Sequence, residues 1–317
     1  MANAADLLTE MTRSLLDKVQ RSGFPPLHQQ PVAQARQSYR AGVGAMEGRR
    51  EDVARVADFT IPGPAGAIPA RLWAPSTDTG LPVFLYLHGG GFVVGGIDTC
   101  EHMCRRIAVQ SGAAVVAIDY RLAPEHRFPA ALDDSFAAFE WLVQHGASVG
   151  VDGHRIAVGG DSAGGTLAAS VALMARDAGL PLALQVLFYP SVQTSSVTES
   201  HKAFSKNLML DADLMRWFEA QARGAGFKSD WRREPLHAAS HQGLAPAFIG
   251  LAECDPLVDE GRQYGDVLRD AGVPVTVQVW LGVVHDFINM PRFVPEALDA
   301  HTAIAQAVRQ AFAQPSA

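Results

Sequence analysis

The stretch IAVGGDSAG, residues 156–164, places a short apolar run directly before a glycine-rich turn that contains Ser162. A helical stretch rich in alanine and leucine follows, at about 163–178. The pattern Gly-x-Ser-x-Gly is typical of a sharp strand-to-helix turn that presents a serine hydroxyl to substrate, and its glycines relieve crowding around a strained backbone. So short a pattern can match by chance, but the strand and helix on either side argue against chance here. The stretch therefore predicts that Ser162 is a nucleophile.

Similar apolar runs alternate with helical stretches along most of the chain. Runs with few polar residues are typical of strands buried on both faces of a sheet, and they occur at 83–87, 114–118, 156–158, 184–188, 247–251 and 275–280. The helical stretches lie at about 101–111, 131–145, 163–178, 257–272 and 295–313. This alternation predicts an α/β fold with a mainly parallel central sheet flanked by helices.

Two segments depart from the alternation. Residues 5–21 carry apolar side chains at helical spacing, which predicts an amphipathic helix that packs on its own protein. A polar segment follows it to about Asp52. Residues 191–235 contain no strand pattern, but they include a helical pattern with Trp217 and Phe218. We expect this second segment to be an insertion that lies over the sheet.

Composition excludes several classes of protein. The chain has 317 residues, of which 48% are apolar, and a formal net charge of -7. No Lys/Arg block suits a nucleic acid partner. No apolar run approaches the roughly 20 residues that span a bilayer, and the N-terminus lacks the apolar region of a secretory signal. We therefore expect a cytoplasmic protein without stable membrane association.

The cysteines are few and their number is odd, which argues against a disulfide framework. Cys100 and Cys104 lie four positions apart, so a helix would place them on one face. A metal or redox pair is one interpretation. We expect two small buried thiols instead, because no second Cys/His pair completes a zinc site. Cys254 stands alone.

A serine nucleophile needs a base, and the base needs a carboxylate that fixes its tautomer. His285 is the best candidate for the base because it follows the last predicted strand. Asp255 follows the preceding strand, and the chain order Ser, Asp, His is that of the α/β-hydrolase triad. Asp259 and Glu260 are rivals for the acid role, about one helical turn further along. Asp255 is also a candidate to cap the helix that follows it.

An oxyanion hole is the third requirement, and the sequence HGGG at residues 88–91 offers one. Its glycines give a loop without side-chain obstruction. The backbone N–H groups of Gly90, Gly91 and Ala163 are the candidate donors to the oxyanion. A phosphate-binding loop is the alternative, but no Lys-Ser/Thr follows and the spacing differs from a dinucleotide fingerprint. We expect His88, beside Gly89, to brace the loop rather than act as a second base.

All these features follow predicted strands, and ligands of such sheets bind outside the carboxyl ends of the strands. Together they resemble the hormone-sensitive-lipase-like family, also called bacterial esterase family IV, over roughly residues 70–290. The segments that carry the resemblance are HGGGF at 88–92, YRLAPE at 120–125, FPAA at 128–131, GDSAG at 160–164 and DPLVDEG at 255–261.

The resemblance implies a carboxylesterase with an α/β-hydrolase fold and a helical cap. The N-terminal part of the cap would be residues 1–50 and the cap insertion 191–235, with the core at 51–190 and 236–317. Such enzymes prefer short-to-medium acyl esters, act on small molecules, need no cofactor or metal and often form dimers. An amidase or other acyl hydrolase with the same triad is the alternative. A non-catalytic ligand-binding receptor on this scaffold is a remote alternative, against which the presence of His285 argues.

Substrate choice has weaker signals. Candidates to line a pocket under the cap are Phe92, Leu208, Met209, Leu210 and Trp217, with Phe218 beside them, although each would equally suit the core of the cap.

One position departs from the family pattern. Many members carry His-Gly-Phe at the catalytic histidine, whereas this chain has His285-Asp286-Phe287. We expect Asp286 to point to solvent. The competing hypothesis is that its carboxylate raises the pKa of His285 and shifts the acidic limb of the pH–rate profile upward.

Overall fold

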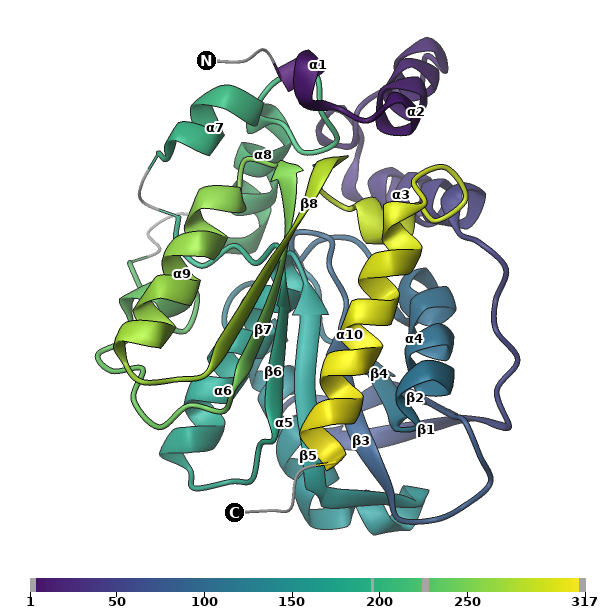
Figure 1. The fold of residues 1–317 in the computed structure, drawn as a ribbon, viewed down its shortest axis with the longest axis vertical. Coiled ribbons are helices and arrows are strands. Elements are labelled where there is room, and N and C mark those ends of the chain that lie inside the picture. Colours follow the sequence, from purple (N-terminus) through teal and green to yellow (C-terminus); the bar gives the residue numbers. More distant parts are fainter. Residues whose placement is uncertain (1–3, 195–196, 224–227, 314–317) are drawn as a thin grey trace.

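One eight-stranded sheet organises the computed structural model, which describes residues 4–194, 197–223 and 228–313 (Figure 1). The strands lie in the order β1-β2-β4-β3-β5-β6-β7-β8. Their bounds are β1 Arg55–Gly63, β2 Gly66–Ala74, β3 Leu81–Leu87, β4 Ala114–Ile118, β5 Val151–Asp161, β6 Leu184–Phe188, β7 Ala247–Cys254 and β8 Val275–Val284. β2 runs antiparallel to both of its neighbours, and all pairs from β4 to β8 are parallel. The predicted mainly parallel α/β fold is confirmed.

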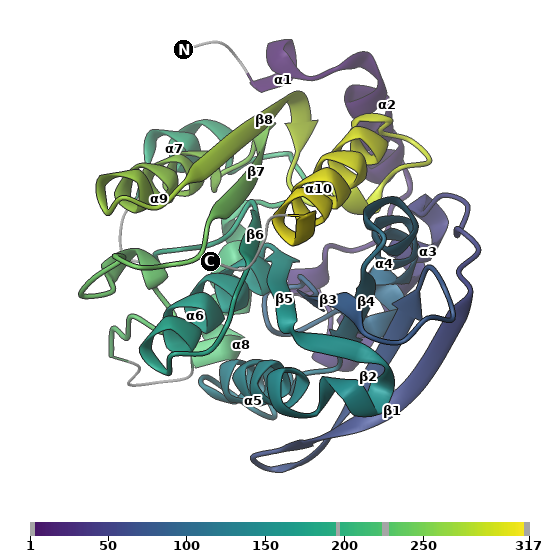
Figure 2. The ribbon, with the colours of Figure 1, turned by 60° about the horizontal axis from the view of Figure 1, so that its bottom comes forward.

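Helices cover both faces of this sheet (Figure 2). α4 (Ile97–Ser111) and α10 (Glu296–Ala313) pack on one face. α5 (Ala130–His145), α6 (Ala163–Asp177) and α9 (Val258–Asp270) pack on the other. These are the five helical stretches that the sequence predicts, with ends shifted by a few residues. The four short 3₁₀ helices are Leu27–Gln29, Gly146–Val149, Pro235–His237 and Phe287–Asn289.

β3 shows why an apolar run without alternation makes a central strand. Successive side chains of a strand point to opposite faces. Val83, Leu85 and Leu87 accordingly join the apolar cluster beneath α5 and α6, while Phe84 and Tyr86 join the cluster beneath α4 and α10. All five are almost fully buried, so the strand has no solvent-facing side and no polar alternation.

The hairpin β1–β2 is not among the strands that the sequence predicts. β1 is an edge strand whose side chains alternate between exposed and partly buried positions, so it lacks a continuous apolar run. Pro62 and Pro69 lie within the two strands, and proline counts against a strand in a sequence pattern. Pairing along the whole length of both strands stabilises the hairpin despite these weak signals.

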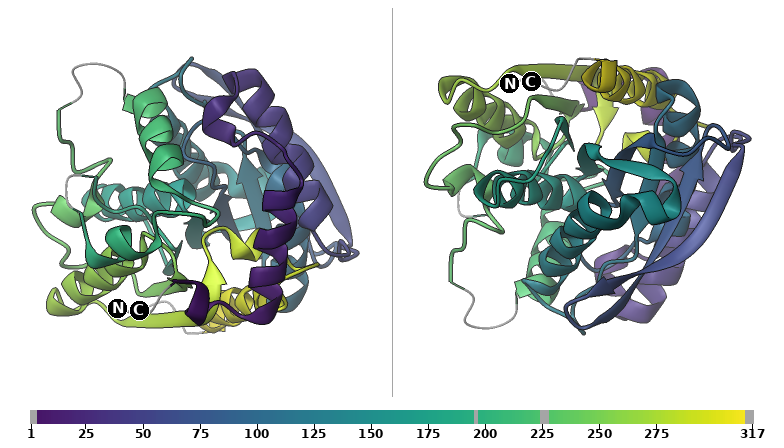
Figure 3. Two further views of the ribbon diagram at one scale, coloured as in Figure 1. Left: turned by 90° about the horizontal axis from the view of Figure 1, so that it is seen from above. Right: turned by 90° about the horizontal axis from the view of Figure 1, so that it is seen from below.

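Five helices lie over the carboxyl ends of the parallel strands and form the cap (Figure 3). They are α1 Ala4–Leu7, α2 Glu10–Arg21, α3 Val32–Met46, α7 Glu199–Phe204 and α8 Ala212–Arg223. The single helix expected over 5–21 is wrong, because Thr9 interrupts it and caps α2 by accepting a hydrogen bond from Thr12 N at 3.2 Å. α3 occupies part of the polar segment before Asp52, for which the sequence predicts no helix because Gly42 and Gly44 weaken the helical pattern.

The cap boundaries at 1–50 and 191–235 remain predictions. Within these two segments, residues 1–3, 195–196 and 224–227 lie outside the described residues. Residues 314–317 of the predicted core also lie outside them. Cys100, Cys104 and Cys254 are buried free thiols. Within the described ranges, no helix combines the length and apolar character that crossing a membrane requires.

Candidate active site

Ser162 occupies a strained turn between β5 and α6. Its φ of 53° lies in a region that side chains rarely adopt. The turn is tight because Gly160 and Gly164 both approach the backbone oxygen of Leu87, and a Cβ at either position would overlap that oxygen. The Ser162 N–H donates to the carbonyl of Phe188 in β6 at 2.8 Å, which holds the turn in place. Strain of this kind clusters at active sites, where the surrounding structure maintains it.

His285 links Ser162 to Asp255. Its Nε2 lies 2.9 Å from Ser162 Oγ, and its Nδ1 lies 2.6 Å from Asp255 Oδ2. Asp255 follows β7 and His285 follows β8, and these neighbouring strands end at the same edge of the sheet as β5. Both side chains are shielded from water, since His285 is 7% exposed and Asp255 is fully buried. The described geometry therefore has the form of a Ser-His-Asp triad.

The two rival carboxylates are engaged elsewhere. Asp259 accepts a hydrogen bond from the N–H of Ser200 in the cap at 2.8 Å. Glu260 accepts from the backbone N–H groups of Val192 and Gln193, at 2.8 and 3.0 Å.

Asp255 has room for a second role, because its Oδ1 accepts from Leu257 N at 2.9 Å, just before α9 begins. This carboxylate thus orients the imidazole of His285 with one oxygen and caps the chain leading into α9 with the other.

Opposing influences act on the pKa of His285. Burial alone would lower it, but the negative charge of Asp255 and the hydrogen bond to it outweigh burial, so the pKa is raised above 6.5. Asp286 and Asp161 add smaller contributions in the same direction. The site therefore favours the positively charged imidazolium form of His285.

The glycine loop lies beside Ser162. Gly90 and Gly91 have φ values of 112° and 59°, which glycine adopts without strain, and Gly90 O accepts from the N–H groups of Val93 and Val94. Gly90, Gly91 and Ala163 line the same cavity as Ser162. Ala163 is the first residue of α6, so its N–H has no acceptor within the helix.

The loop is braced from below by buried polar groups. Asp161 Oδ1 accepts from Gly89 N at 2.9 Å and from the Tyr86 hydroxyl at 2.5 Å. The His88 ring stacks on Tyr120 with centroids 4.2 Å apart, and the Tyr120 hydroxyl donates to His88 O at 2.6 Å. Burial lowers the pKa of His88, so this imidazole is neutral near pH 7. These contacts give His88 the bracing position that the sequence predicts.

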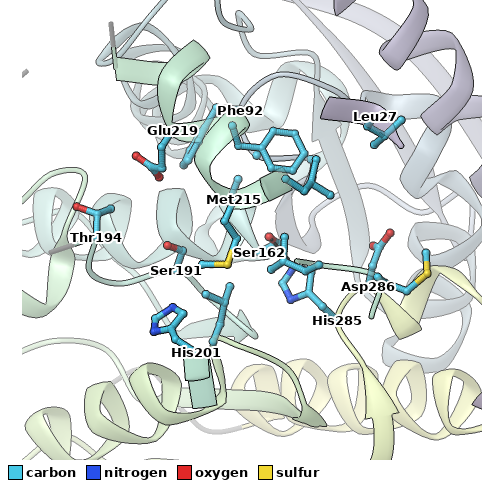
Figure 4. A pocket seen from close by; sticks show the side chains of 18 of the residues that line it. Leu27, Phe92, Ser162, Ser191, Thr194, His201, Met215, Glu219, His285 and Asp286 are labelled. Atoms are coloured by element: carbon cyan, nitrogen blue, oxygen red, sulfur yellow. Dashed lines mark hydrogen bonds between the residues drawn. The ribbon is translucent and has the colours of Figure 1, made fainter. Parts of the chain in front are cut away.

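A cavity of about 200 Å³ opens above Ser162 and His285, between the core and the cap (Figure 4). Phe92, Met209 and Leu210 line it as expected, and so does Phe218. Leu208 and Trp217 do not line it.

These two expectations fail for a geometric reason. Leu208 packs against the cluster of Leu8, Cys254 and Val284, and Trp217 packs against the cluster around Ala35 and Val93. Leu214, Met215, Phe218 and Glu219 share the face of α8 that lines the cavity, and Trp217 lies off that face.

Several lining residues carry no sequence motif that marks them. They come from the cap and from loops around it, and they are Leu27, Tyr39, Ser191, Gln193, Thr194, His201, Leu214, Met215, Glu219 and Arg233. Only contacts between distant segments bring them together, so a pattern in one sequence could not identify them. Arg233, for example, pairs with Glu219 and lies over the Phe92 ring, 4.7 Å from its centroid.

Asp286 is the main correction to the expected site. It lines the cavity and is partly buried, so the expectation that it points to solvent is wrong. Its Oδ1 accepts from Asn289 Nδ2 at 2.6 Å, and the Tyr39 hydroxyl is one of the groups that act on the pKa of its carboxylate. Burial, followed by the charge of Asp161, raises the pKa of Asp286 to about 7.

Replacing Asp286 with glycine should move the acidic limb of the kcat/KM profile to lower pH. His285 must be neutral to accept the Ser162 proton, and the Asp286 charge is one of the influences that raise its pKa. Glycine suits the φ of 68° at this position, so the backbone should be retained. The measurement is kcat/KM for a neutral p-nitrophenyl ester from pH 5 to 9. An unmoved limb would show that Asp286 does not tune the base.

Comparison with known proteins adds independent information. Residues 84–289 match the α/β hydrolase fold family. The chain is 42% identical over 259 residues to esterase LipI of Mycobacterium tuberculosis, covering 78% of this chain and 79% of LipI. It is 35% identical over 293 residues to an ethyl acetate hydrolase of Pseudomonas putida, covering 90% and 92% of the two chains.

Solved structures are similar over nearly the full length. LAE6, an α/β hydrolase from the metagenome of Lake Arreo, superimposes with a TM-score of 0.94 at 40% identity, covering 98% of this chain and 100% of LAE6. The esterase of Pyrobaculum calidifontis superimposes with a TM-score of 0.90 at 39% identity, covering 96% and 98%.

Proposed function

Because this chain belongs to the hormone-sensitive-lipase-like esterases of the α/β-hydrolase fold and is a carboxylesterase, we propose that it cleaves esters through Ser162, His285 and Asp255. The observation that carries the proposal is the unbroken chain of contacts from Ser162 Oγ to His285 Nε2 at 2.9 Å and from His285 Nδ1 to Asp255 at 2.6 Å.

In the first half-reaction, Ser162 Oγ attacks the ester carbonyl carbon while His285 Nε2 takes the hydroxyl proton. The carbonyl oxygen becomes an oxyanion, which the N–H groups of Gly90, Gly91 and Ala163 stabilise. When the tetrahedral intermediate collapses, the bond to the alcohol oxygen breaks and His285 gives its proton to that oxygen. The alcohol leaves and Ser162 remains acylated.

In the second half-reaction, a water molecule replaces the alcohol. His285 takes a proton from the water, whose oxygen attacks the acyl carbon, and the same N–H groups hold the second oxyanion. Collapse releases the carboxylic acid and returns the proton to Ser162. Asp255 stays ionised throughout and holds the imidazole with its Nδ1 proton facing the carboxylate.

Short-to-medium acyl esters fit the cavity best. Its volume of about 200 Å³ lies below the range of roughly 300–1,000 Å³ that is typical of sites for drug-sized ligands. Cap residues restrict it from above with apolar side chains, among them Leu214, Met215 and Phe218. The ethyl acetate hydrolase of Pseudomonas putida, a relative, is named for a small ester.

A panel of p-nitrophenyl esters with acyl chains from two to sixteen carbons tests this function. We expect kcat/KM to be highest for short-to-medium chains and to fall steeply for long ones, because long chains exceed the cavity. A matched anilide should react far more slowly than the phenyl ester. A maximum at the longest chains, or equal rates for the anilide, would contradict the proposal.

A further inference from the structure

Asp286 and Tyr39 form a polar patch on one side of the cavity. Asp286 belongs to the loop after β8 and Tyr39 to helix α3 of the cap, and both line the cavity with Ser162 and His285. Figure 4 shows Asp286 on the opposite side of Ser162 from Ser191, Thr194 and His201. The cavity therefore has two chemically different sides, separated by the nucleophile.

Both members of the patch are held in place. Arg36, one helical turn before Tyr39, donates to Val93 O at 2.8 Å and to Ala123 O at 2.9 Å, and these bonds fix α3 on the core. Asn289 fixes the carboxylate of Asp286 from the other side. The Tyr39 hydroxyl thus meets a carboxylate whose orientation is already set.

Asp286 occupies a position that the backbone alone would give to glycine. Its φ of 68° is left-handed, which costs a non-glycine residue free energy. The carboxylate is in addition partly withdrawn from water, which is unfavourable for a charge. A strained residue whose side chain faces a catalytic cavity indicates a function for that side chain.

The carboxylate has unused capacity to bind a ligand. Ionised, it can accept about four hydrogen bonds, whereas within the described residues only the side-chain amide of Asn289 donates one to it. In the described part of the chain, no Lys or Arg forms a salt bridge with Asp286. The remaining lone pairs and the charge are therefore available on the cavity side.

The mechanism indicates which part of the ester lies near this patch. His285 must protonate the leaving alcohol, so the alcohol oxygen comes within a hydrogen bond of Nε2. Asp286 is the next residue along the chain and lines the same cavity. The alcohol part of the substrate accordingly extends past His285 toward Asp286 and Tyr39, and the acyl part extends toward the opposite side.

We propose that Asp286, held by Asn289, is a specificity-determining residue that selects esters whose alcohol part carries a positive charge or a hydrogen-bond donor, and that it disfavours alcohols bearing a carboxylate. This inference rests on the proposed function, because it assigns the two sides of the cavity from the role of His285.

The selection should depend on pH in a defined direction. The titratable groups that act on Asp286 are Tyr39 of α3, His285 of the same loop, Asp161 at the end of β5 and Tyr189 after β6. The pKa of Asp286 is raised to about 7, chiefly by burial, so the carboxylate is charged above this pH and neutral below it. Preference for a cation should appear as pH rises through about 7 and disappear as it falls.

Two isosteric acetates test the proposal: acetylcholine, which carries a trimethylammonium group, and 3,3-dimethylbutyl acetate, which carries a neutral tert-butyl group. The rate of acid release, measured in a pH-stat, gives kcat/KM for each ester. The ionisation of His285 affects both esters equally, so it cancels from the ratio of the two kcat/KM values. We expect the ratio to rise about tenfold between pH 6 and 8.5, the effect of roughly 1.4 kcal/mol of charge interaction.

Matched variants separate this account from a structural role. Asp286→Asn keeps the shape and suits the left-handed backbone, and it should give a low ratio that is independent of pH. Tyr39→Phe removes a hydroxyl group that lowers the pKa of Asp286, so the rise in the ratio should move to higher pH. The control is a pair of butyl esters that differ in the charge of the acyl part: the butyl ester of betaine and butyl 3,3-dimethylbutanoate. The ratio of their kcat/KM values should be the same in wild type and in Asp286→Asn.

The inference would be overturned if the ratio for the two acetates did not change with pH in the wild type, or if it were equal in wild type and Asp286→Asn. It would also be overturned if Asp286→Asn changed the ratio for the two butyl esters and left the ratio for the two acetates unchanged. Failure of the proposed function looks different, because the Ser162→Ala variant would then still hydrolyse the neutral acetate.

Discussion

Replacing Ser162 with alanine should lower kcat for a short p-nitrophenyl ester by about 10⁴–10⁶-fold. The variant lacks the oxygen that attacks the carbonyl, so no acyl-enzyme can form. Any residual rate would come from the oxyanion donors and from binding alone. Release of p-nitrophenol, measured at saturating substrate, checks the expectation.

The fold should survive this change. The Ser162 side chain makes its described hydrogen bond to His285, whereas the turn is held through its backbone N–H and the carbonyl of Phe188. Alanine keeps the Cβ and the same backbone preference. We therefore expect an unchanged far-UV circular dichroism spectrum, and turnover near that of the wild type by a folded variant would contradict the role of Ser162.

Replacing Asp255 with asparagine should lower kcat by about 10³–10⁴-fold. An amide that donates to Nδ1 would favour the imidazole tautomer that carries its proton on Nε2, and this tautomer cannot accept the proton of Ser162. Asparagine still offers an oxygen to Leu257 N, so the start of α9 keeps its cap. The rate loss should therefore occur without a comparable loss of thermal stability.

Asp259→Asn is the matched control for this prediction. Asp259 lies one turn further along the same segment but accepts from Ser200 N in the cap and does not contact His285. We expect its kcat to stay within a few-fold of wild type. An equal loss in both variants, or a larger loss in Asp259→Asn, would contradict the assignment of Asp255 as the acid of the triad.

The core of the fold follows from local sequence because its strands are buried on both faces. Runs such as 83–87 and 114–118 have no solvent side, so they are recognisable without any partner. The triad follows for a related reason. Parallel strands end at one edge of the sheet, so Ser162, Asp255 and His285 could be expected to meet there from their places after strands.

The cap and its cavity do not follow from sequence in this way. Trp217 and Phe218 have equal apolar character and pack against the same cluster, and only the orientation of α8 over the core decides that Phe218 lines the cavity and Trp217 does not. The edge strand β1 also cannot be recognised from the sequence. Part of this strand faces solvent, so it has no continuous apolar run like those of the central strands.

Asp286 illustrates the same limit at the scale of one side chain. A carboxylate beside the base would be expected to seek water, but Asp286 is partly buried and lines a cavity together with Tyr39 from a helix far away in the sequence. Such a cavity exists only once the cap has docked, and no local pattern records it.

Covalent labelling with a fluorophosphonate tests most directly whether Ser162 is the nucleophile. The account predicts one adduct per chain by intact-protein mass spectrometry, located on Ser162 by peptide mapping, absent in Ser162→Ala and formed much more slowly in Asp255→Asn. An adduct on another residue, or undiminished labelling of Ser162→Ala, would contradict it.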